Sequence, residues 1–175
     1  HTVNYPDKAD VYQLQMTNKT TYVVDGEEHQ LVKKKAKMFI RLLGLRIPIS
    51  KTYYQSIYGP ALKNKSGVFA IRTPSTTNIN ALEQWWRMNK ARSFSEFYSV
   101  LEWNALPGYN IGYADRNDTI FYISNGKIPR RDPSYNWQKT LPGNTKKTLW
   151  DSYYSTQELP QVIAPKAGYV YNANH

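Results

Sequence analysis

Hydrophobic and polar positions alternate along most of the first 76 residues of the chain. In residues 11–16, Tyr12, Leu14 and Met16 fall on one side of an extended backbone, so a half-buried strand is predicted there. The Asp25-Gly26 pair is a strong signal for a hairpin turn. Further strands are predicted at residues 21–24, 28–49, 52–57 and 68–72. The second of these is expected to be interrupted near Gly44 and to end by Pro48, and the third to end before a break at Gly59-Pro60. Residues 1–76 are therefore expected to be mostly antiparallel β structure.

The long predicted strand near residue 35 has two chemically different faces. Basic residues share one parity and apolar residues the other: Lys33, Lys35, Lys37 and Arg41 against Val32, Ala36, Met38, Ile40 and Leu42. Because side chains alternate across a strand, the charges lie on one face and the apolar set on the opposite face. We interpret the charged side as a solvent-facing surface, with a nucleic-acid-binding stripe as the alternative.

After Pro74 the hydrophobic period changes to that of a helix. Asn80 with Glu83, and Ser93 with Glu96, resemble capping boxes, and they predict helix starts before residues 81–90 and near residue 94. The apolar residues that follow at helical spacing are Leu82, Trp85 and Trp86 in the first helix, and Phe94, Phe97, Tyr98 and Leu101 in the second. Two short antiparallel helices are expected, and the aromatic stripe is expected to pack on a sheet rather than to line a pocket.

The last third of the chain returns to strands and turns. Strands are predicted near 109–115 and 118–123, joined by a turn at Arg116-Asn-Asp, and a final strand is predicted at residues 168–172. The whole chain is expected to be α+β, mostly antiparallel β with a short helical pair. It divides into a β-rich part at 1–76, the helical pair at 77–106 and a β and loop region at 107–175.

Composition narrows the chemistry without identifying it. The 175 residues carry a formal charge of +10, with 15 tyrosines and 5 tryptophans, which suits a module that binds polyanions or carbohydrate. The sequence has no cysteine, which excludes disulfides and thiol catalysis within it, and no apolar run of about 18 residues that could span a membrane. No nucleic-acid-binding motif is present, so nucleic acid is not the expected partner.

The sequence contains no complete catalytic apparatus. The three histidines are far apart, and no spacing of histidine and carboxylate residues predicts a metal site. Asp115 and Asp118 are explained by a turn between strands rather than by an acid–base pair. Thr2 would become an N-terminal nucleophile only if His1 were removed, and nothing around it resembles a cleavage site.

A series of short motifs nevertheless resembles the penicillin acylase family of N-terminal-nucleophile hydrolases, which includes acyl-homoserine-lactone acylases. The motif residues are Asn110, Tyr113, Ala114 and Asp115; Ile120 and Tyr122; Gly126, Pro129 and Arg131; Pro142 and Gly143; Trp150; Glu158, Leu159 and Pro160; Pro165; and Gly168, Asn172 and Asn174. Tyr58-Gly59-Pro60 is similar to the family's His-Gly-Pro turn, and the match covers about residues 52–175, in the middle of the larger, β subunit. Tyr58, Thr119 and Ala164 depart from the family pattern, and we interpret them as divergence at structural positions.

The resemblance implies a partial segment of an αββα fold and an amidohydrolase as the parent protein. The family's nucleophile is a Ser at a new N-terminus exposed by autocleavage. It would lie before residue 1, so this segment alone is expected to be inactive. Only Asn174 corresponds to a catalytic position, as the side-chain amide donor to the oxyanion. His175 follows it and is a further candidate for lining the site, while substrate-binding residues stay unknown.

The resemblance also implies the partners of the segment. These are the α subunit and the nucleophile-bearing start of the β subunit, together with a small-molecule acyl amide substrate and no membrane. No cofactor or metal is expected in this segment, although the parent protein is a candidate for a structural calcium ion. A periplasmic or secreted location is implied by the family alone. A non-catalytic basic, Tyr-rich binding module, or a structural fragment stable only against missing partners, remains as an alternative.

Overall fold

The computed structural model describes residues 2–4, 7–76 and 78–173. These residues form two compact units. Unit 1 is built from residues 1–8, 74–130 and 151–175, and unit 2 from residues 9–73 and 131–150. Each unit is described by itself below.

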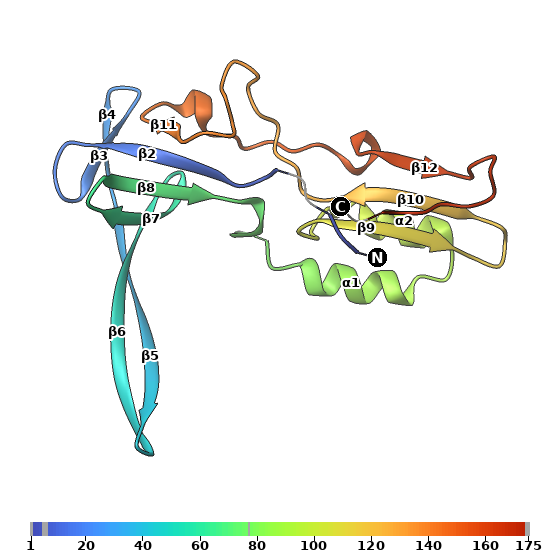
Figure 1. Cartoon of the computed structure of the whole chain (residues 1–175), viewed down its shortest axis with the longest axis horizontal. Coiled ribbons are helices and arrows are strands. Elements are labelled where there is room, and N and C mark those ends of the chain that lie inside the picture. The colour runs from blue at the N-terminus through green and yellow to red at the C-terminus, as the bar shows by residue number, and fades with distance from the viewer. Residues whose placement is uncertain (1, 5–6, 77, 174–175) are drawn as a thin grey trace. The chain divides into compact units, whose positions relative to one another are not determined.

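Unit 2 is an eight-stranded sheet whose strands are antiparallel apart from one short parallel edge (Figure 1). The path β4-β3-β2-β8-β7-β6-β5 is joined by β11, which pairs with β2 in parallel. The strands are β2 (Asp10–Met16), β3 (Thr21–Val24), β4 (Glu27–Gln30), β5 (Val32–Leu42), β6 (Leu45–Ser56), β7 (Gly59–Asn64), β8 (Gly67–Arg72) and β11 (Leu141–Gly143), followed by a 3-10 turn at Lys146–Thr148.

The core of unit 2 is centred on two fully buried tyrosines. The rings of Tyr12 and Tyr58 lie 4.7 Å apart between centroids, and their hydroxyls donate to the carbonyls of Thr148 and Thr145 at 3.0 and 2.8 Å. Burial raises the pKa of Tyr58 to about 12. Tyr58 stands where the family has His, and here it packs as a neutral aromatic residue whose polar end is satisfied. Gly59 beside it has φ +137°, and a Cβ there would lie 2.1 Å from the carbonyl oxygen of Ile71.

The predicted break at Pro48 is wrong. Strand β6 runs from Leu45 to Ser56 through Pro48, which pairs with Phe39 at the middle of a two-stranded ribbon. Proline is tolerated because β5 and β6 stand without a third strand over this length, so the position of its missing N–H lies at an open edge. The turn predicted near Gly44 is confirmed, with Leu43 and Gly44 both at positive φ.

Unit 1 packs two helices against one face of a four-stranded antiparallel sheet (Figure 1). The sheet order is β1-β9-β10-β12. Its elements are β1 (Thr2–Val3), α1 (Ala81–Lys90), α2 (Phe94–Leu101), β9 (Tyr109–Ala114), β10 (Ile120–Asn125) and β12 (Gln161–Ile163), with 3-10 turns at Pro74–Thr76 and Thr156–Glu158. Phe97 and Leu101 from α2 pack on Ile111, Phe121 and Ile123 of the sheet, as the aromatic stripe predicts.

The two predicted helix starts have different outcomes. Ser93 caps α2, because its Oγ accepts the amide of Glu96 at 3.2 Å. Asn80 has no side-chain cap bond, since its backbone (φ −84°, ψ 1°) is not extended, and Glu83 pairs with Arg87 instead. The strand predicted at 168–172 is also wrong: the described residues of that segment form a turn and an irregular stretch. The predicted class, mostly antiparallel β with a short helical pair, is confirmed.

Candidate active site

The one catalytic residue carried over by resemblance, Asn174, lies outside the described residues, as does His175. The chain is described up to Ala173, so the approach to this position is visible. The surroundings of Asn172, two residues before Asn174, are therefore the candidate site.

Asn172 is held against the sheet of unit 1 by polar contacts from two other segments. Its Nδ2 donates to Thr2 Oγ1 at 2.9 Å, and its Oδ1 lies 3.4 Å from the hydroxyl of Tyr122. That hydroxyl donates to Asn110 Oδ1 at 2.9 Å, and Asn110 Nδ2 in turn lies 3.4 Å from Thr2 Oγ1. Three of these four residues sit in β1, β9 and β10, so strand pairing sets their positions. The contacts fix where the chain leaves the sheet on its way to Asn174.

A small hollow lies at this network, on the sheet face that carries Asn110 and Gly112. Its volume is about 130 Å³, and Thr2, Tyr122 and Asn172 line it together with Val170 and Tyr171. Amide and hydroxyl groups of this kind can orient a polar substrate by hydrogen bonds. The Thr2 hydroxyl, which the sequence analysis considered as a nucleophile, accepts a hydrogen bond from Asn172. In this structure the hydroxyl therefore has a structural role.

On the helix side of the same sheet lies an apolar pocket of about 180 Å³. Its lining comes from both helices, the loop after them and strand β9: Trp85, Met88, Asn89, Phe97, Leu106, Tyr109, Ile111 and Gly112. Trp85 meets Tyr109 edge to face at 5.1 Å between ring centroids, which gives the pocket a rigid aromatic wall. The expectation that the aromatic stripe packs on a sheet and does not line a pocket is therefore incomplete, since Phe97 does both.

Gln84 positions the helix that supplies the pocket wall. Its side chain is fully buried, and its Oε1 accepts the amides of Ala105 and Leu106 at 2.6 and 3.1 Å. This ties α1 to the loop that carries Leu106 into the pocket. Gln84 lies on the buried face of α1, whereas Leu82 and Trp86 of the same helix are exposed. The spacing of apolar residues therefore predicted the helix but not which of its faces is buried.

Gly112 lines both the apolar pocket and the polar hollow. It lies in β9 opposite Tyr122, and a Cβ built on it would meet nothing within 4 Å. A side chain here would point to the same face as Asn110, so its absence leaves the polar hollow open. The apolar pocket and the polar hollow thus lie on opposite faces of the same strand.

Asp115 stabilises the hairpin turn between β9 and β10, as the sequence indicates. Its carboxylate accepts the amides of Asn117 and Thr119 at 2.9 and 3.1 Å and the hydroxyl of Tyr113 at 3.0 Å. Partial desolvation opposes ionisation, but these hydrogen bonds outweigh it and lower the pKa of Asp115. A carboxylate held in the ionised form by a turn is poorly suited to act as a general acid or base at neutral pH.

Among the described residues, no group of three His, Cys, Asp or Glu side chains is placed to bind a metal ion. The calcium ion implied for the parent protein therefore has no candidate ligand group in this part of the chain.

Several motif residues hold unit 2 together. Arg131 Nε and Nη2 donate to Asp10 Oδ2 at 3.1 and 3.0 Å, and Trp150 Nε1 donates to the same oxygen at 2.6 Å. Ala164 in unit 1 has φ +46°, a conformation that the Asn of the family pattern adopts more easily than Ala does. The contacts of Arg131 and Trp150 are thus structural ones within unit 2.

The sequence model of the family described as penicillin amidase matches residues 1–175. The chain belongs to the penicillin amidase family. An acyl-homoserine lactone acylase PvdQ of Pseudomonas fluorescens is 25% identical over 192 aligned residues, which cover 93% of this chain and 25% of the relative. Penicillin G acylase of Escherichia coli is 30% identical over 97 residues, covering 55% of this chain and 11% of that protein.

The fold matches as well as the sequence. The structure of a penicillin G acylase from Alcaligenes faecalis superimposes with a TM-score of 0.83 at 21% identity, over 99% of this chain and 32% of that one. The chain thus spans about a quarter of the PvdQ relative and about a third of the penicillin G acylase structure. Both matches cover nearly all of the chain itself. No helix among the described residues is long and apolar enough to cross a membrane.

Proposed function

We propose that the parent protein of this segment hydrolyses the amide bond of an acylated amine. The candidate substrates are penicillins, cephalosporins and acyl-homoserine lactones, in which the amine carries a lactam or lactone. This follows from membership of the penicillin amidase family and from the names of the acylases that the chain matches. The observation that carries the proposal furthest is the apolar pocket between the two helices and strand β9.

The pocket is suited to the acyl part of such a substrate. An apolar cavity of about 150 Å³ is large enough to hold benzene, so a pocket of about 180 Å³ accepts a phenyl ring or a short alkyl chain. Its aromatic and aliphatic walls gain affinity by removing apolar surface from water.

The chemical step needs a nucleophile that this segment does not supply. By resemblance, a Ser at a processed N-terminus attacks the carbonyl carbon, and its own α-amine takes the hydroxyl proton. The C–N bond breaks as that proton passes to the leaving amine, and water then hydrolyses the acyl-enzyme ester. During both attacks negative charge builds on the carbonyl oxygen, and the side-chain amide of Asn174 donates a hydrogen bond to it.

The test is an Asn174→Ala substitution in the full-length protein. Loss of one oxyanion donor lowers kcat by about 10²–10³-fold, so a fall of that size is expected with little change in KM. Asn117→Ala, in the exposed turn after β9, is the matched control and should retain full activity. Unchanged turnover and unchanged acyl-enzyme formation in Asn174→Ala would refute the assignment.

A second candidate function rests on the basic face of β5. Lys33, Lys35 and Lys37 are exposed on one side of that strand, which favours contact with a polyanion or an acidic carbohydrate. Binding to heparin or DNA whose affinity falls steeply with salt would support a binding module. Absence of binding at low salt would remove this candidate.

The proposed partners and location follow from the same family assignment. The remainder of the precursor, with its α subunit and the start of the β subunit, completes the enzyme. Such autoprocessed acylases suggest a periplasmic or secreted protein that inactivates an antibiotic or a quorum-sensing signal. Fractionation of cells that express the full-length gene tests the location directly.

A further inference from the structure

The β5–β6 arm, defined as Val32–Leu42 and Leu45–Ser56 with the turn between them, is a two-stranded ribbon that extends out of the unit 2 sheet (Figure 1). Its eleven paired positions correspond to about 35 Å of extended chain at roughly 3.3 Å per residue. A two-stranded ribbon without further packing is marginally stable in water. The arm therefore requires an explanation for its stability beyond its own hydrogen bonds.

One face of the distal half of the arm is entirely apolar. Three alternate cross-strand pairs share it, and all six side chains are exposed by 37% to 68%: Met38 with Ile49, Ile40 with Ile47, and Leu42 with Leu45. Cross-strand neighbours pack side by side, so these pairs form one continuous apolar strip. The predicted division into two faces is confirmed, but the apolar face packs on no described part of the chain.

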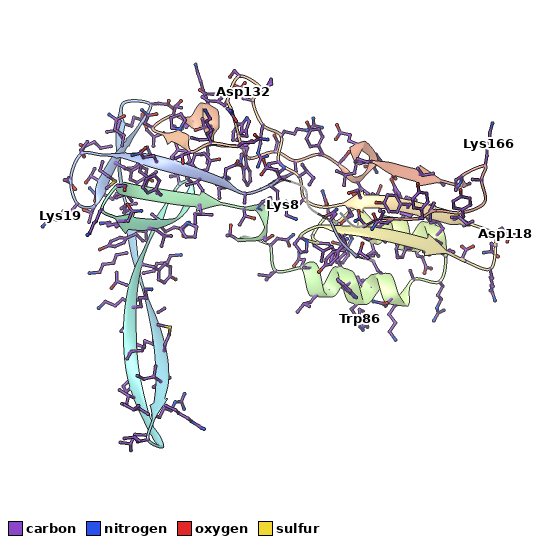
Figure 2. All side chains as sticks on the ribbon, in the orientation of Figure 1. Lys8, Lys19, Trp86, Asp118, Asp132 and Lys166 are labelled. Carbon is purple, nitrogen blue, oxygen red and sulfur yellow. The ribbon has the colours of Figure 1, made fainter. Side chains whose placement is uncertain are left out.

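The opposite face has different chemistry. Arg41 pairs with Arg46, and the Arg46 guanidinium lies 4.0 Å from the ring centroid of Phe39. Lys35 and Lys37 continue this face toward the sheet. Side chains project from both sides of the ribbon in Figure 2. A ribbon with one charged face and one apolar face is amphipathic, and its apolar face is the one suited to burial.

The tip of the arm provides an independent sign of a covered surface. Leu43 has φ +50° and is 95% exposed. With Gly44 also at positive φ, the turn needs two left-handed residues in succession, for which Asn-Gly and Asp-Gly are strongly preferred. A leucine in this left-handed conformation is strained, and its side chain exposes apolar surface to water. No contact within the described residues compensates for either unfavourable effect.

We infer that the apolar face of the β5–β6 arm, with Leu43 at its end, docks into a part of the parent polypeptide that lies outside residues 1–175. This rests on the proposal that the segment belongs to a longer acylase. The occupant is inferred from length, because the segment spans only 25% of a relative that it matches along nearly all of its own sequence. The remaining chain belongs to the same precursor, so it is present at high effective concentration and needs no separate partner. The cationic face then points away from the contact.

The test compares two neighbouring positions on opposite faces of β5 in the full-length protein. Single cysteines are introduced as Ile40→Cys and Arg41→Cys, in a background whose other cysteines, where present, are replaced by serine. The described segment contributes none. The thiol at position 40 is expected to react with a polar maleimide at least about ten times more slowly than the thiol at position 41. The two rates should become equal in denaturant.

Equal rates under native conditions would overturn the inference. Protection at position 40 that is lost on dilution would also overturn it, because the covering surface would then be a second copy. Leu43→Asn provides a separate readout. Asn fits the turn better, so a free tip predicts an unchanged or higher Tm, whereas a buried Leu43 predicts a fall of at least about 2 °C. Amide hydrolysis is measured on the same proteins, so an inactive protein with a shielded position 40 refutes the proposed function alone.

Discussion

Asp10 joins three stretches of unit 2 that are far apart in the sequence. Its side chain is fully buried in β2, and its Oδ2 accepts hydrogen bonds from Arg131 and from Trp150. Arg72 adds to this cluster by donating to the carbonyl of Trp150 at 3.0 Å while lying over its ring. A single carboxylate therefore connects the strand to both ends of residues 131–150.

Replacement of Asp10 by Ala is expected to lower the free energy of unfolding of the parent protein by about 2–4 kcal/mol, because Arg131 and Trp150 both lose the buried carboxylate oxygen that they share. Chemical denaturation followed by fluorescence measures this change. Asp151→Ala removes an exposed carboxylate and serves as the control, with an expected change below about 0.5 kcal/mol. A loss at Asp10 no larger than that of the control would show that the cluster does not stabilise the unit.

Glu158 is the carboxylate whose ionisation matters most to the loop before β12. The amide of Ser155, the guanidinium of Arg130 and the hydroxyl of Ser155 all bond to it, in that order of importance, and they lower its pKa from 4.5 to about 2. These contacts form a capping box around Thr156–Glu158. The ionised form is thus the one that the folded chain stabilises.

Because the folded pKa is depressed, the stabilisation is fully present above pH 4.5 and is lost as the pH falls toward 2. We expect the Tm difference between the parent protein and Glu158→Gln to be largest near neutral pH and to shrink across that acid range. Calorimetric scans between pH 7 and 2 measure it, with Glu27→Gln in β4 as an exposed control. A difference that does not change with pH would contradict the role of ionised Glu158.

Strand β9 separates the two halves of the candidate site. Tyr109 and Ile111 face the helices and line the apolar pocket, while Asn110 faces the opposite side and contacts Tyr122. Alternation along one strand thus places an apolar wall and a polar anchor one residue apart, on opposite faces. Gly112 shares the face of Asn110, so a side chain added there would enter the polar hollow.

Gly112→Val adds a side chain to the polar hollow and is therefore expected to raise KM for acylated amines by about 10-fold, to a similar extent for short and long acyl groups. The Tm should not fall, since the Cβ position is open and valine suits a strand. Ala114→Val adds bulk to an exposed position in the same strand and is the control for such crowding. An unchanged KM would separate the polar hollow from substrate binding.

On the scale of the whole molecule, the segment resembles one part of a larger enzyme. The exposed apolar strip of the β5–β6 arm and the exposed Leu82 and Trp86 of α1 leave apolar surface uncovered in both units. The positions that would complete the chemistry, a processed Ser and the surroundings of Asn174, lie outside the described residues. The proposed activity therefore belongs to the parent protein.

Residues 1–175 produced alone are expected to show no amide hydrolysis, because the proposed nucleophile is a Ser outside these residues. A chromogenic acyl anilide measures this, with the full-length protein as the positive control and circular dichroism to verify folding of the segment. Turnover by the segment would place the nucleophile within this chain and overturn the assignment to an upstream Ser.

The local pattern of the sequence determined most elements of the fold. Alternation in residues 11–16, the Asp25-Gly26 turn, the Ser93 cap and the helical spacing of residues 81–90 are short-range effects, and each is confirmed. The ordered motifs of the last third identified the family, which the match over residues 1–175 shows. These features can be predicted from the sequence because they depend on residues close together in the chain.

Contacts between distant residues were decided by the tertiary structure alone. Pro48 continues a strand because its neighbours leave an edge open, and residues 168–172 form no strand because no partner pairs with them among the described residues. The pocket around Gly112 and the network of Asn172 join segments up to 170 residues apart. Periodicity shows which face of an element is apolar, but only packing decides whether that face is covered, lines a pocket or stays exposed.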